Sequence, residues 1–292
     1  MIRIVHLSDL HFGAVAWETV RPLLDVISEL QPTLVVISGD LTQRARKRQF
    51  ELARDFVAEL PETAPVIAVP GNHDVPLWDI LRRMVAPLRR FDRYVTSDPF
   101  PQYIDDEIAV VGVNTARSLT IKNGRINREQ LARIERVLEQ SAPDALRIVV
   151  AHHPFVLPED EPLTDRVGRT ELALPVFLRV GVDLLLTGHR HHTWTSAPHP
   201  GLLAVHAGTA TSRRVRREDN AFNLIEVRRE SVSIQRFLWR PEEEIFAAPH
   251  FDRVRSFPRS GGRIITESED EASGPPGVEE PIEPVTTKGA LK

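Results

Sequence analysis

The sequence predicts a layered α/β fold, because segments typical of strands and of helices alternate along its first half. Apolar runs of strand length lie at 2–7, 34–38, 66–69, 108–113, 146–151, 183–187, 202–207, 222–228 and 231–238. Several runs consist almost only of Val, Ile, Leu and Ala, which is typical of strands buried on both faces. We expect a largely parallel first half and, from about residue 183, a second, antiparallel sheet, because Pro, Gly and Ser separate the strands there.

Helices are predicted between the early strands from apolar side chains that recur every three to four residues. Such stripes occupy 20–30, 50–60 and 131–138. The last one follows Asn127 with Gln130 three residues later, which is the pattern of a capping box. Residues 77–88 also have helical spacing, with Leu77, Ile80, Leu81 and Met84 on one side.

Composition excludes several classes of protein. The 292-residue chain has no cysteine, which excludes disulfides, thiolate metal ligands and cysteine nucleophiles. It has no run of about 18 apolar residues, so no transmembrane helix is expected. The chain opens directly into strand-like residues rather than into a signal peptide, from which we expect a cytoplasmic protein.

The formal net charge of −4 is unevenly distributed. Residues 266–292 hold seven acidic residues and two lysines, a balance of −5, so the remainder carries +1 (−4 minus −5). This near-neutral body does not predict binding to a nucleic acid duplex. From residue 258 the chain is rich in Pro, Gly, Ser and Glu, so we expect one domain at 1–257 and a disordered acidic tail at 258–292. The alternative is that 263–265 adds a short edge strand.

Polar residues with metal-binding side chains follow five of the predicted strands, at the point where each strand ends. The clusters are Asp9-Leu10-His11, Gly39-Asp40, Gly71-Asn72-His73-Asp74, His152-His153-Pro154 and Gly188-His189-Arg190-His191. Each is a weak signal alone, because such residues are common in turns. In an open α/β sheet, however, ligands collect beyond the carboxyl ends of the strands, where all five clusters are expected.

The pooled side chains point to a metal site. Imidazole and carboxylate ligands without sulfur suit Mn, Fe, Zn or Co better than Ca or Mg. Seven protein ligands are too many for one tetrahedral ion. They suit two ions about 3.5–4 Å apart, as two-metal hydrolases use.

The order of these motifs resembles that of the calcineurin-like metallophosphoesterases, over roughly residues 1–225. The resemblance implies a four-layer α-β-β-α sandwich of two mixed sheets. It also implies two sets of metal ligands: Asp9, His11, Asp40 and His191 for one ion, and Asp40, Asn72, His152 and His189 for the other, with Asp40 as the bridge. The family pattern puts a ligand two residues before Pro154, so His153 is expected to be a neighbour and not a ligand.

The resemblance further implies a metal-dependent hydrolase of phosphoric esters, in which a hydroxide generated between the ions attacks phosphorus. His73 matches the family's catalytic histidine that binds no metal. It is expected to stabilise the transition state or to protonate the leaving alkoxide. Asp74 is expected to orient the His73 ring.

Residues 39–44, 114–117 and 208–213 resemble loops of one branch of the family, the class III cyclic-nucleotide and glycerophosphodiester phosphodiesterases. A small phosphodiester is therefore the expected substrate. Arginine pairs well with phosphate oxygens, and four arginines follow strand-like runs from which they could reach a phosphate: Arg44, Arg117, Arg213 and Arg214. The residues expected to contact the substrate are Arg44, Asn72, Asn114, Arg117 and Arg213.

Three other functions stay open. A pyrophosphohydrolase of the UDP-2,3-diacylglucosamine type needs an apolar groove, for which the insert at 75–100 is the candidate. A nuclease of the same fold is disfavoured by the near-neutral body, and a non-catalytic scaffold is disfavoured by the complete ligand set with His73. Residues 238–251, with Trp239, Phe246 and Phe251, either pack on the sheet or form a contact in a homo-oligomer.

Overall fold

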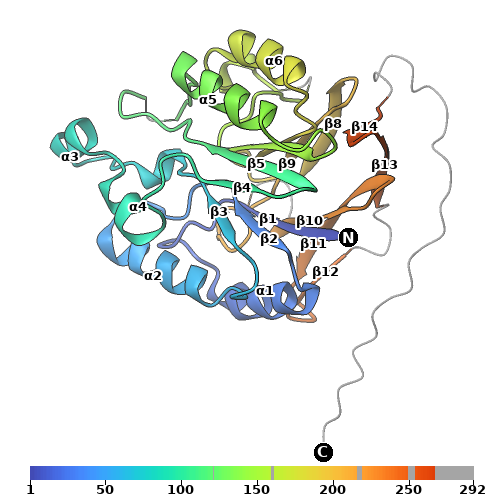
Figure 1. The fold of residues 1–292 in the computed structure, drawn as a ribbon. Helices are drawn as coiled ribbons and strands as arrows, with labels where there is room; N and C mark the ends of the chain where they lie inside the picture. Colours follow the sequence, from blue (N-terminus) through green and yellow to red (C-terminus); the bar gives the residue numbers. More distant parts are fainter. Residues whose placement is uncertain (121, 159–160, 216–218, 249–253, 267–292) are drawn as a thin grey trace, which may run out of the picture.

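The computed structural model describes residues 1–120, 122–158, 161–215, 219–248 and 254–266. Two mixed sheets pack face to face, and helices cover their outer faces (Figure 1). This arrangement confirms the four-layer α-β-β-α sandwich. Within the described residues, no helix is both long enough and apolar enough to cross a membrane.

The first sheet has the strand order β14-β13-β11-β10-β1-β2-β3, with β12 beside β11. Its parallel part is β1 (Ile2–Leu7), β2 (Leu34–Ile37) and β3 (Val66–Ala68). Antiparallel pairing adds β10 (Ala221–Val227), β11 (Ser231–Arg240), β12 (Ile245–Ala247), β13 (Arg255–Ser260) and β14 (Arg263–Ile264).

The second sheet has the order β4-β5-β6-β7-β9-β8. Its four central strands are parallel: β5 (Ile108–Val113), β6 (Leu146–Ala151), β7 (Leu184–Thr187) and β9 (Leu202–His206). The edge strands β4 (Gln102–Ile104) and β8 (Trp194–His199) are antiparallel to their neighbours.

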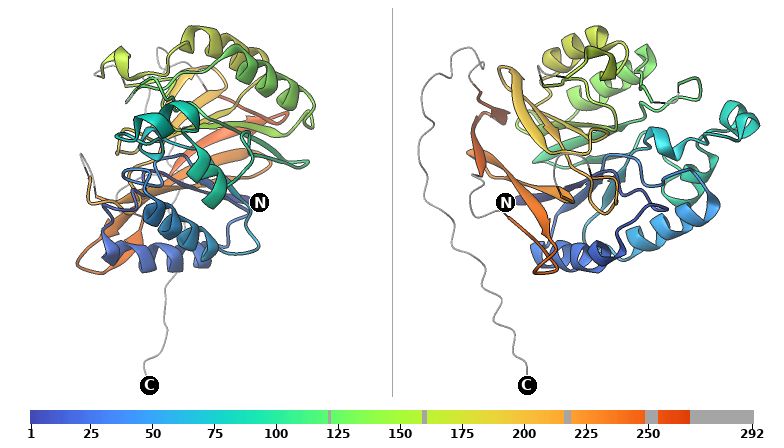
Figure 2. Two further views of the ribbon diagram at one scale, coloured as in Figure 1. Left: turned by 90° about the vertical axis from the view of Figure 1, so that its left-hand side faces the viewer. Right: turned by 180° about the vertical axis from the view of Figure 1, so that it is seen from behind.

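The helices form the two outer layers (Figure 2). Apolar side chains of α1 (Trp17–Leu30) and α2 (Lys47–Ala58) share a core with Val5 and Val35 of the first sheet. Those of α5 (Arg128–Glu139) and α6 (Thr170–Arg179) share a core with Val149 of the second sheet. Two short helices, α3 (Ile80–Val85) and α4 (Arg89–Tyr94), and the 3₁₀ turns η1 (Asn72–Asp74) and η2 (Leu163–Asp165) complete the set.

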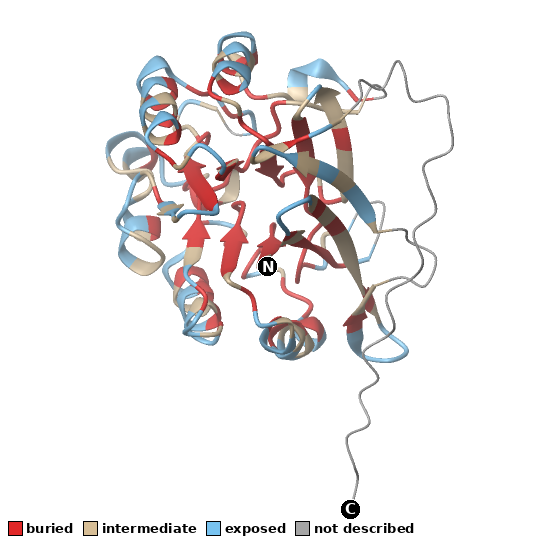
Figure 3. Ribbon diagram, turned by 45° about the vertical axis from the view of Figure 1, so that its right-hand side comes forward, coloured by how far each residue is buried: buried red, intermediate tan, exposed pale blue. Residues whose placement is uncertain are grey.

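Side-chain alternation along the central strands explains why their sequences are apolar throughout. Val5 and Leu7 of β1 face the helices, whereas Ile2 and Ile4 face the core between the sheets. Both faces of the central strands are therefore buried, as the red strands at the centre of Figure 3 show. At α5, the predicted capping box is present: Asn127 Oδ1 accepts from Gln130 N at 2.8 Å.

The prediction of a separate antiparallel sheet after residue 183 is wrong. Strands β7 and β9 are parallel neighbours in the second sheet, whereas β10 crosses to the first sheet and pairs antiparallel with β1. Strand β10 forms backbone hydrogen bonds with the side of β1 that β2 leaves unpaired. In this pairing Ile4 lies opposite Ile225. Nothing in a short apolar run indicates which distant strand it will pair with.

The domain boundary expected after residue 257 does not fall there, because strands β13 and β14 continue the first sheet to Ile264. The alternative of a short edge strand at 263–265 corresponds to β14. Its Ile264 is buried, and Asp183 Oδ1 accepts a hydrogen bond from Ile264 N at 3.3 Å. Residues 267–292, where the acidic tail is predicted, lie outside the described residues.

Two aromatic side chains of the segment 238–251 settle its packing. Trp239 and Phe246 are buried in the first core, with ring centroids 5.3 Å apart, so these two pack on the sheet. Phe251 lies outside the described residues, and a homo-oligomer stays a prediction.

The helix expected over 77–88 is shorter than predicted, because only α3 (Ile80–Val85) falls within it, and its apolar stripe is not buried. Ile80, Leu81 and Met84 are exposed on a helix that projects from the body (Figure 1). Helical spacing of apolar residues predicts an amphipathic helix but not which surface its apolar side will contact.

Candidate metal centre

The five polar clusters meet where the parallel strands of both sheets end. Asp9 and His11 follow β1, Asp40 follows β2, and η1 follows β3. The remaining clusters follow β6 and β7 of the facing sheet. Among the described residues other than glycine, nine have positive φ, and five of these are predicted ligands: Asp9, His11, Asp40, His189 and His191. Left-handed backbone is costly for such residues, and its concentration in one place is typical of functional sites.

One group of buried donors consists of Asp9, His11 and His191. Asp9 Oδ2 accepts hydrogen bonds from Ser8 Oγ at 2.6 Å and from His189 N at 2.9 Å. Asp9 Oδ1 is buried and accepts no hydrogen bond, although it lies 3.4 Å from His11 Nε2 and 3.2 Å from His191 Nε2. His191 Nδ1 faces the Arg214 carbonyl oxygen at 2.8 Å, which leaves Nε2 to face the group.

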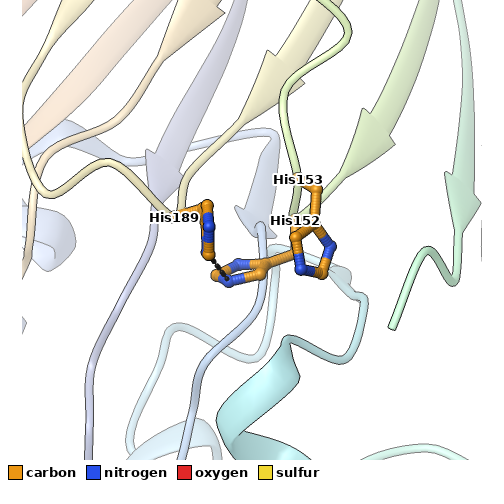
Figure 4. A group of neighbouring side chains, drawn as sticks. All are labelled: His152, His153 and His189. Carbon is orange, nitrogen blue, oxygen red and sulfur yellow. Dashed lines mark hydrogen bonds between the residues drawn. The ribbon is translucent and has the colours of Figure 1, made fainter. Parts of the chain in front are cut away.

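The second group is centred on His152. Its Nδ1 faces the Ser38 carbonyl oxygen at 2.8 Å, so Nε2 points into the site. That Nε2 atom lies 3.3 Å from His189 Nδ1 and 3.3 Å from Asn72 Oδ1. Figure 4 shows the rings of His152 and His189 approaching each other from the ends of their two strands.

The Asp40 carboxylate lies between the two groups. Its Oδ1 accepts a hydrogen bond from His73 N at 2.8 Å. Its Oδ2 lies 3.3 Å from His152 Nε2 in one group and 3.8 Å from His11 Nε2 in the other. A single oxygen atom therefore faces donors of both groups.

The electrostatics of the groups suit a bound cation. Burial opposes ionisation of Asp9, but His191 and His11 outweigh it and hold the pKa of this carboxyl well below its usual range. Burial likewise opposes ionisation of Asp40, and His152 outweighs it, so the pKa of Asp40 is also lowered. The His152 ring is buried as well, yet Asp40 raises its pKa to about 9. In the metal-free protein, a proton on His152 thus partly balances the two carboxylates, and cations compete for the same lone pairs.

The donor atoms fit transition metal ions. Asp9, His11 and His191 offer ligand atoms within 4.8 Å of one another, and so do Asp9, Asp40 and His152. Asp9 Oδ1 is a buried carboxylate oxygen without a hydrogen-bond partner, which is costly unless a cation satisfies it. The buried Asp and His clusters are consistent with a dinuclear metal site.

A family model of calcineurin-like phosphoesterases matches residues 2–193, which include all five clusters. The chain belongs to this family. It is 28% identical over 66% of its length to a Synechococcus protein named probable cyclic nucleotide phosphodiesterase, of which the match covers 74%. It is 26% identical over the same share to an Arcobacter nitrofigilis protein named probable glycerophosphodiester phosphodiesterase GpdQ, of which the match covers 73%. Among solved structures, a dimetal phosphatase from Danio rerio has the same fold, with a TM-score of 0.57 and 16% identity over 80% of this chain and 95% of that one.

In this calcineurin-like phosphoesterase, His153 lies in a cluster with His152 and His189, but both of its ring nitrogens have hydrogen-bond partners outside the metal groups. Its Nδ1 lies 2.8 Å from Thr115 Oγ1, and its Nε2 lies 2.9 Å from the Lys122 carbonyl oxygen. Burial lowers the pKa of His153 to about 3, so the ring is neutral. That His152 and not His153 binds a metal stays a prediction from its position relative to Pro154.

His73 lines a cavity of about 180 Å³ beside the two groups. Its Nδ1 donates to the Gln43 carbonyl oxygen at 2.9 Å, and its Nε2 accepts from Arg214 Nη1 at 3.0 Å. The His11 ring stands edge-on to it at 4.9 Å between centroids. Burial lowers the pKa of His73, so the ring is neutral at neutral pH.

The expectation that Asp74 orients the His73 ring is wrong, because the Gln43 carbonyl holds that ring instead. Asp74 Oδ1 accepts from Thr42 N and Thr42 Oγ1, and Oδ2 accepts from Leu41 N and Gly71 N. It therefore ties the loop after β2 to the loop after β3. Four backbone and hydroxyl donors are a stronger attraction for a buried carboxylate than one ring nitrogen.

The expected substrate residues divide into two sets. Arg44 and Asn72 line the cavity beside His73. Arg213 does not: it lines a separate hollow with Trp17 and Leu52. Asn114 Oδ1 accepts from Ala116 N at 2.9 Å, and the Arg117 carbonyl accepts from Arg83, so both residues take part in loop structure outside the cavity lining.

Sequence reasoning left four cavity residues out of the expected site, Gln43, Val75, Leu77 and Lys122, and it grouped Arg214 with Arg213 without singling it out. Arg214 was distinguishable from Arg213 only by side-chain direction, because neighbouring residues in an extended segment point to opposite sides. Lys122 stands in a loop without any motif, and no feature of the sequence indicated it.

Proposed function

We propose that this calcineurin-like phosphoesterase hydrolyses small phosphodiesters of the cyclic-nucleotide or glycerophosphodiester class. The observation that carries the proposal is the position of Asp40 Oδ2, between two groups of buried donors and beside a cavity. A pair of cations bridged by one carboxylate is the arrangement that in-line displacement at phosphorus uses.

The residues that would hold the metals follow from the two groups. Asp9, His11 and His191 would hold one ion, and Asn72, His152 and His189 would hold the other, with Asp40 shared. The carbonyl oxygens of Ser38 and Arg214 fix the imidazole orientations by accepting from Nδ1. When bound, such ions polarise a phosphoryl oxygen and make hydroxide available near neutral pH.

The cavity favours an anionic substrate with an apolar or neutral substituent. Arg44, Lys122 and Arg214 bring positive charge to its lining, where Asp40 is the one acidic residue. Val75 and Leu77 supply an apolar wall that suits the alcohol group of a diester. The names of the Synechococcus and Arcobacter relatives agree with a diester.

His73 and Arg214 would act on the substrate together. Their hydrogen bond faces the cavity, so a phosphate oxygen that enters can take over the Arg214 donor. Once Arg214 has turned to the phosphate, His73 Nε2 is free to take up a proton from solvent, which it would deliver to the leaving oxygen. The Gln43 carbonyl keeps the ring in this orientation throughout.

The test is turnover by protein reconstituted with Mn²⁺, Fe²⁺, Zn²⁺ or Co²⁺. The substrates are an activated diester, a cyclic nucleotide, a glycerophosphodiester and a phosphomonoester. We expect metal-dependent hydrolysis of the diesters with a higher kcat/KM than of the monoester. Equal or higher kcat/KM for the monoester would contradict the proposal, and so would preference for a UDP-linked diacylglucosamine in detergent.

A further inference from the structure

An apolar surface projects into solvent next to the cavity. It comprises six side chains of α3, its flanks and the neighbouring loop, which we call the α3 apolar surface. Their exposed fractions are 82% for Trp78, 77% for Leu81, 75% for Val85, 71% for Ile80, 69% for Leu119 and 57% for Met84. Contiguous apolar groups of this number are uncommon on a surface that contacts only water, and they mark an interaction site.

The α3 apolar surface is held in place by one buried cation. The Arg83 side chain donates from Nε to the Ser118 carbonyl at 2.6 Å and from Nη1 to the Pro76 carbonyl at 2.8 Å. It also donates to the Thr120 carbonyl. These bonds fasten α3 to the loop that carries Leu119.

Positive charge surrounds these apolar side chains. Residues 76–94 contain five arginines and two aspartates; with Arg83 buried and Arg82 paired with Asp79 at 2.9 Å, Arg89, Arg90 and Arg93 outnumber Asp92. The loop at 115–125 contains Arg117, Lys122 and Arg125 and no acidic residue. The charge argues against a two-fold contact between copies of this surface, which would bring the two basic patches together.

We propose that the α3 apolar surface docks on an anionic lipid bilayer. Trp78, Leu81 and Val85 would enter the headgroup region, and the exposed arginines Arg89 and Arg93 would pair with lipid phosphates. A tryptophan with aliphatic neighbours and flanking cations is the composition of interfacial anchors. Val75 and Leu77 precede α3 and line the cavity, so docking would bring the mouth of the cavity to the lipid surface.

The experiment measures binding of the full chain to vesicles, by co-sedimentation with phosphatidylglycerol–phosphatidylcholine mixtures and with phosphatidylcholine alone. The test variant is Trp78→Ser/Leu81→Ser/Val85→Ser. The control variant is Ile104→Ser/Ile265→Ser, which removes two exposed apolar side chains elsewhere; Ile104 pairs with Ala109 near the start of β5, away from the site. Sedimentation velocity gives the oligomeric state of each protein.

We expect the wild-type and control proteins to bind the anionic vesicles, and added salt to weaken this binding. The test variant should bind at least about tenfold more weakly. No wild-type binding, or equal binding by the test variant, would overturn the proposal. A wild-type dimer that the triple substitution converts to monomer, without vesicle binding, would show that a second copy covers the surface.

This outcome is independent of the proposed hydrolysis, because vesicle binding requires no turnover. All the variants should hydrolyse a soluble activated diester like the wild type. Vesicle binding without any hydrolysis would leave the docking proposal standing and would refute the proposed function.

Discussion

At the residue scale, His73 and Asp40 are joined by one hydrogen bond but face different partners. Asp40 Oδ2 faces imidazole nitrogens of both donor groups, whereas the His73 ring faces a backbone carbonyl and a guanidinium. The two residues therefore have separable roles. Loss of Asp40 should act on metal binding, and loss of the His73 side chain should act on turnover.

His73→Ala should retain both metals and lose turnover by about 10²–10⁴, because a positioned proton donor contributes that much to ester cleavage. Metal content is measured by elemental analysis, and turnover is measured on an activated diester. The control is His199→Ala, which removes a half-buried histidine on β8. Near-normal turnover by fully metallated His73→Ala would remove the proposed role.

Asp40→Ala should lose metal outright, because the substitution removes the oxygen that faces both groups and leaves buried histidines without their counter-charge. Elemental analysis after dialysis against metal-containing buffer gives the stoichiometry. Asp106→Ala, at an exposed aspartate, is the matched control. A variant with two bound ions would show that the bridging assignment is wrong.

At the element scale, the turns at the strand ends position the donors. Asp74 fastens the turn after β2 to the turn after β3. Its carboxylate does so by accepting from backbone N–H groups, not from the histidine rings of the metal groups. Arg190 has a comparable place between His189 and His191, where it forms ion pairs with Glu161 and Asp165. Each of these side chains stabilises a turn that carries predicted ligands, although burial raises the pKa of the Asp74 carboxyl to about 7.

Asp74→Ala should lower metal occupancy and turnover together, since Gly71 N, Thr42 N and Leu41 N would lose their acceptor. The free energy of unfolding should fall by about 1–3 kcal/mol, the usual cost of unsatisfied buried donors. Metal titration and denaturant unfolding measure the two effects. His73→Ala is the comparison, because it should keep its metals. Full metal occupancy in Asp74→Ala would show that Asp74 does not hold the turns that carry the ligands.

Sequence patterns predicted those elements whose environment is set by local chemistry. Central strands buried on both faces have uniformly apolar sequences, and Asn127 with Gln130 marks the start of α5. The pairing of β10 with β1 was not predictable, because it joins residues more than 200 positions apart through backbone groups that every residue carries. The partners of Asp74 and the choice of Arg214 over Arg213 depend on side-chain direction in turns, which residue type does not determine.

At the scale of the whole molecule, the donors come from both sheets, so metal binding should couple to folding. Asp9 and Asp40 belong to the first sheet, and His152, His189 and His191 to the second. Ions bound to these residues would link the two sheets at the carboxyl ends of their parallel strands. Stability measurements therefore report on the site without any substrate.

Chelation of the metals should lower the melting temperature. A ligand that binds only the folded state at about 100 times its Kd stabilises by about 2.7 kcal/mol per site. Differential scanning calorimetry with metal and with a chelator measures the difference. Asp40→Ala should show no such difference. If the wild-type melting temperature is the same with metal and with chelator, metal binding is not coupled to folding.

Stability should also fall with acid, because buried neutral histidines away from the site gain protons only on unfolding. Burial lowers the pKa of His206 to about 3, and its Nε2 faces the Val156 carbonyl at 3.1 Å. The unfolded chain has a histidine pKa of about 6.5, so between these values it binds more protons than the folded chain.

His206→Gln retains a donor for the Val156 carbonyl but cannot titrate. Between about pH 7 and pH 5, the wild-type free energy of unfolding should therefore fall by about 2 kcal/mol more than that of the variant. Urea unfolding at the two pH values measures how the free energy of unfolding changes with pH in each protein. Because the variant retains every other titrating group, the difference between the two proteins reports on His206 alone. Identical slopes would show that His206 is charged in the folded protein.

The most direct test of the metal centre is anomalous diffraction from crystals grown with Mn²⁺. We expect two anomalous peaks, one on either side of Asp40, with Asp9, His11 and His191 around one and Asn72, His152 and His189 around the other. His73 should contact neither ion. A single peak, no peak, or peaks away from Asp40 would contradict the account.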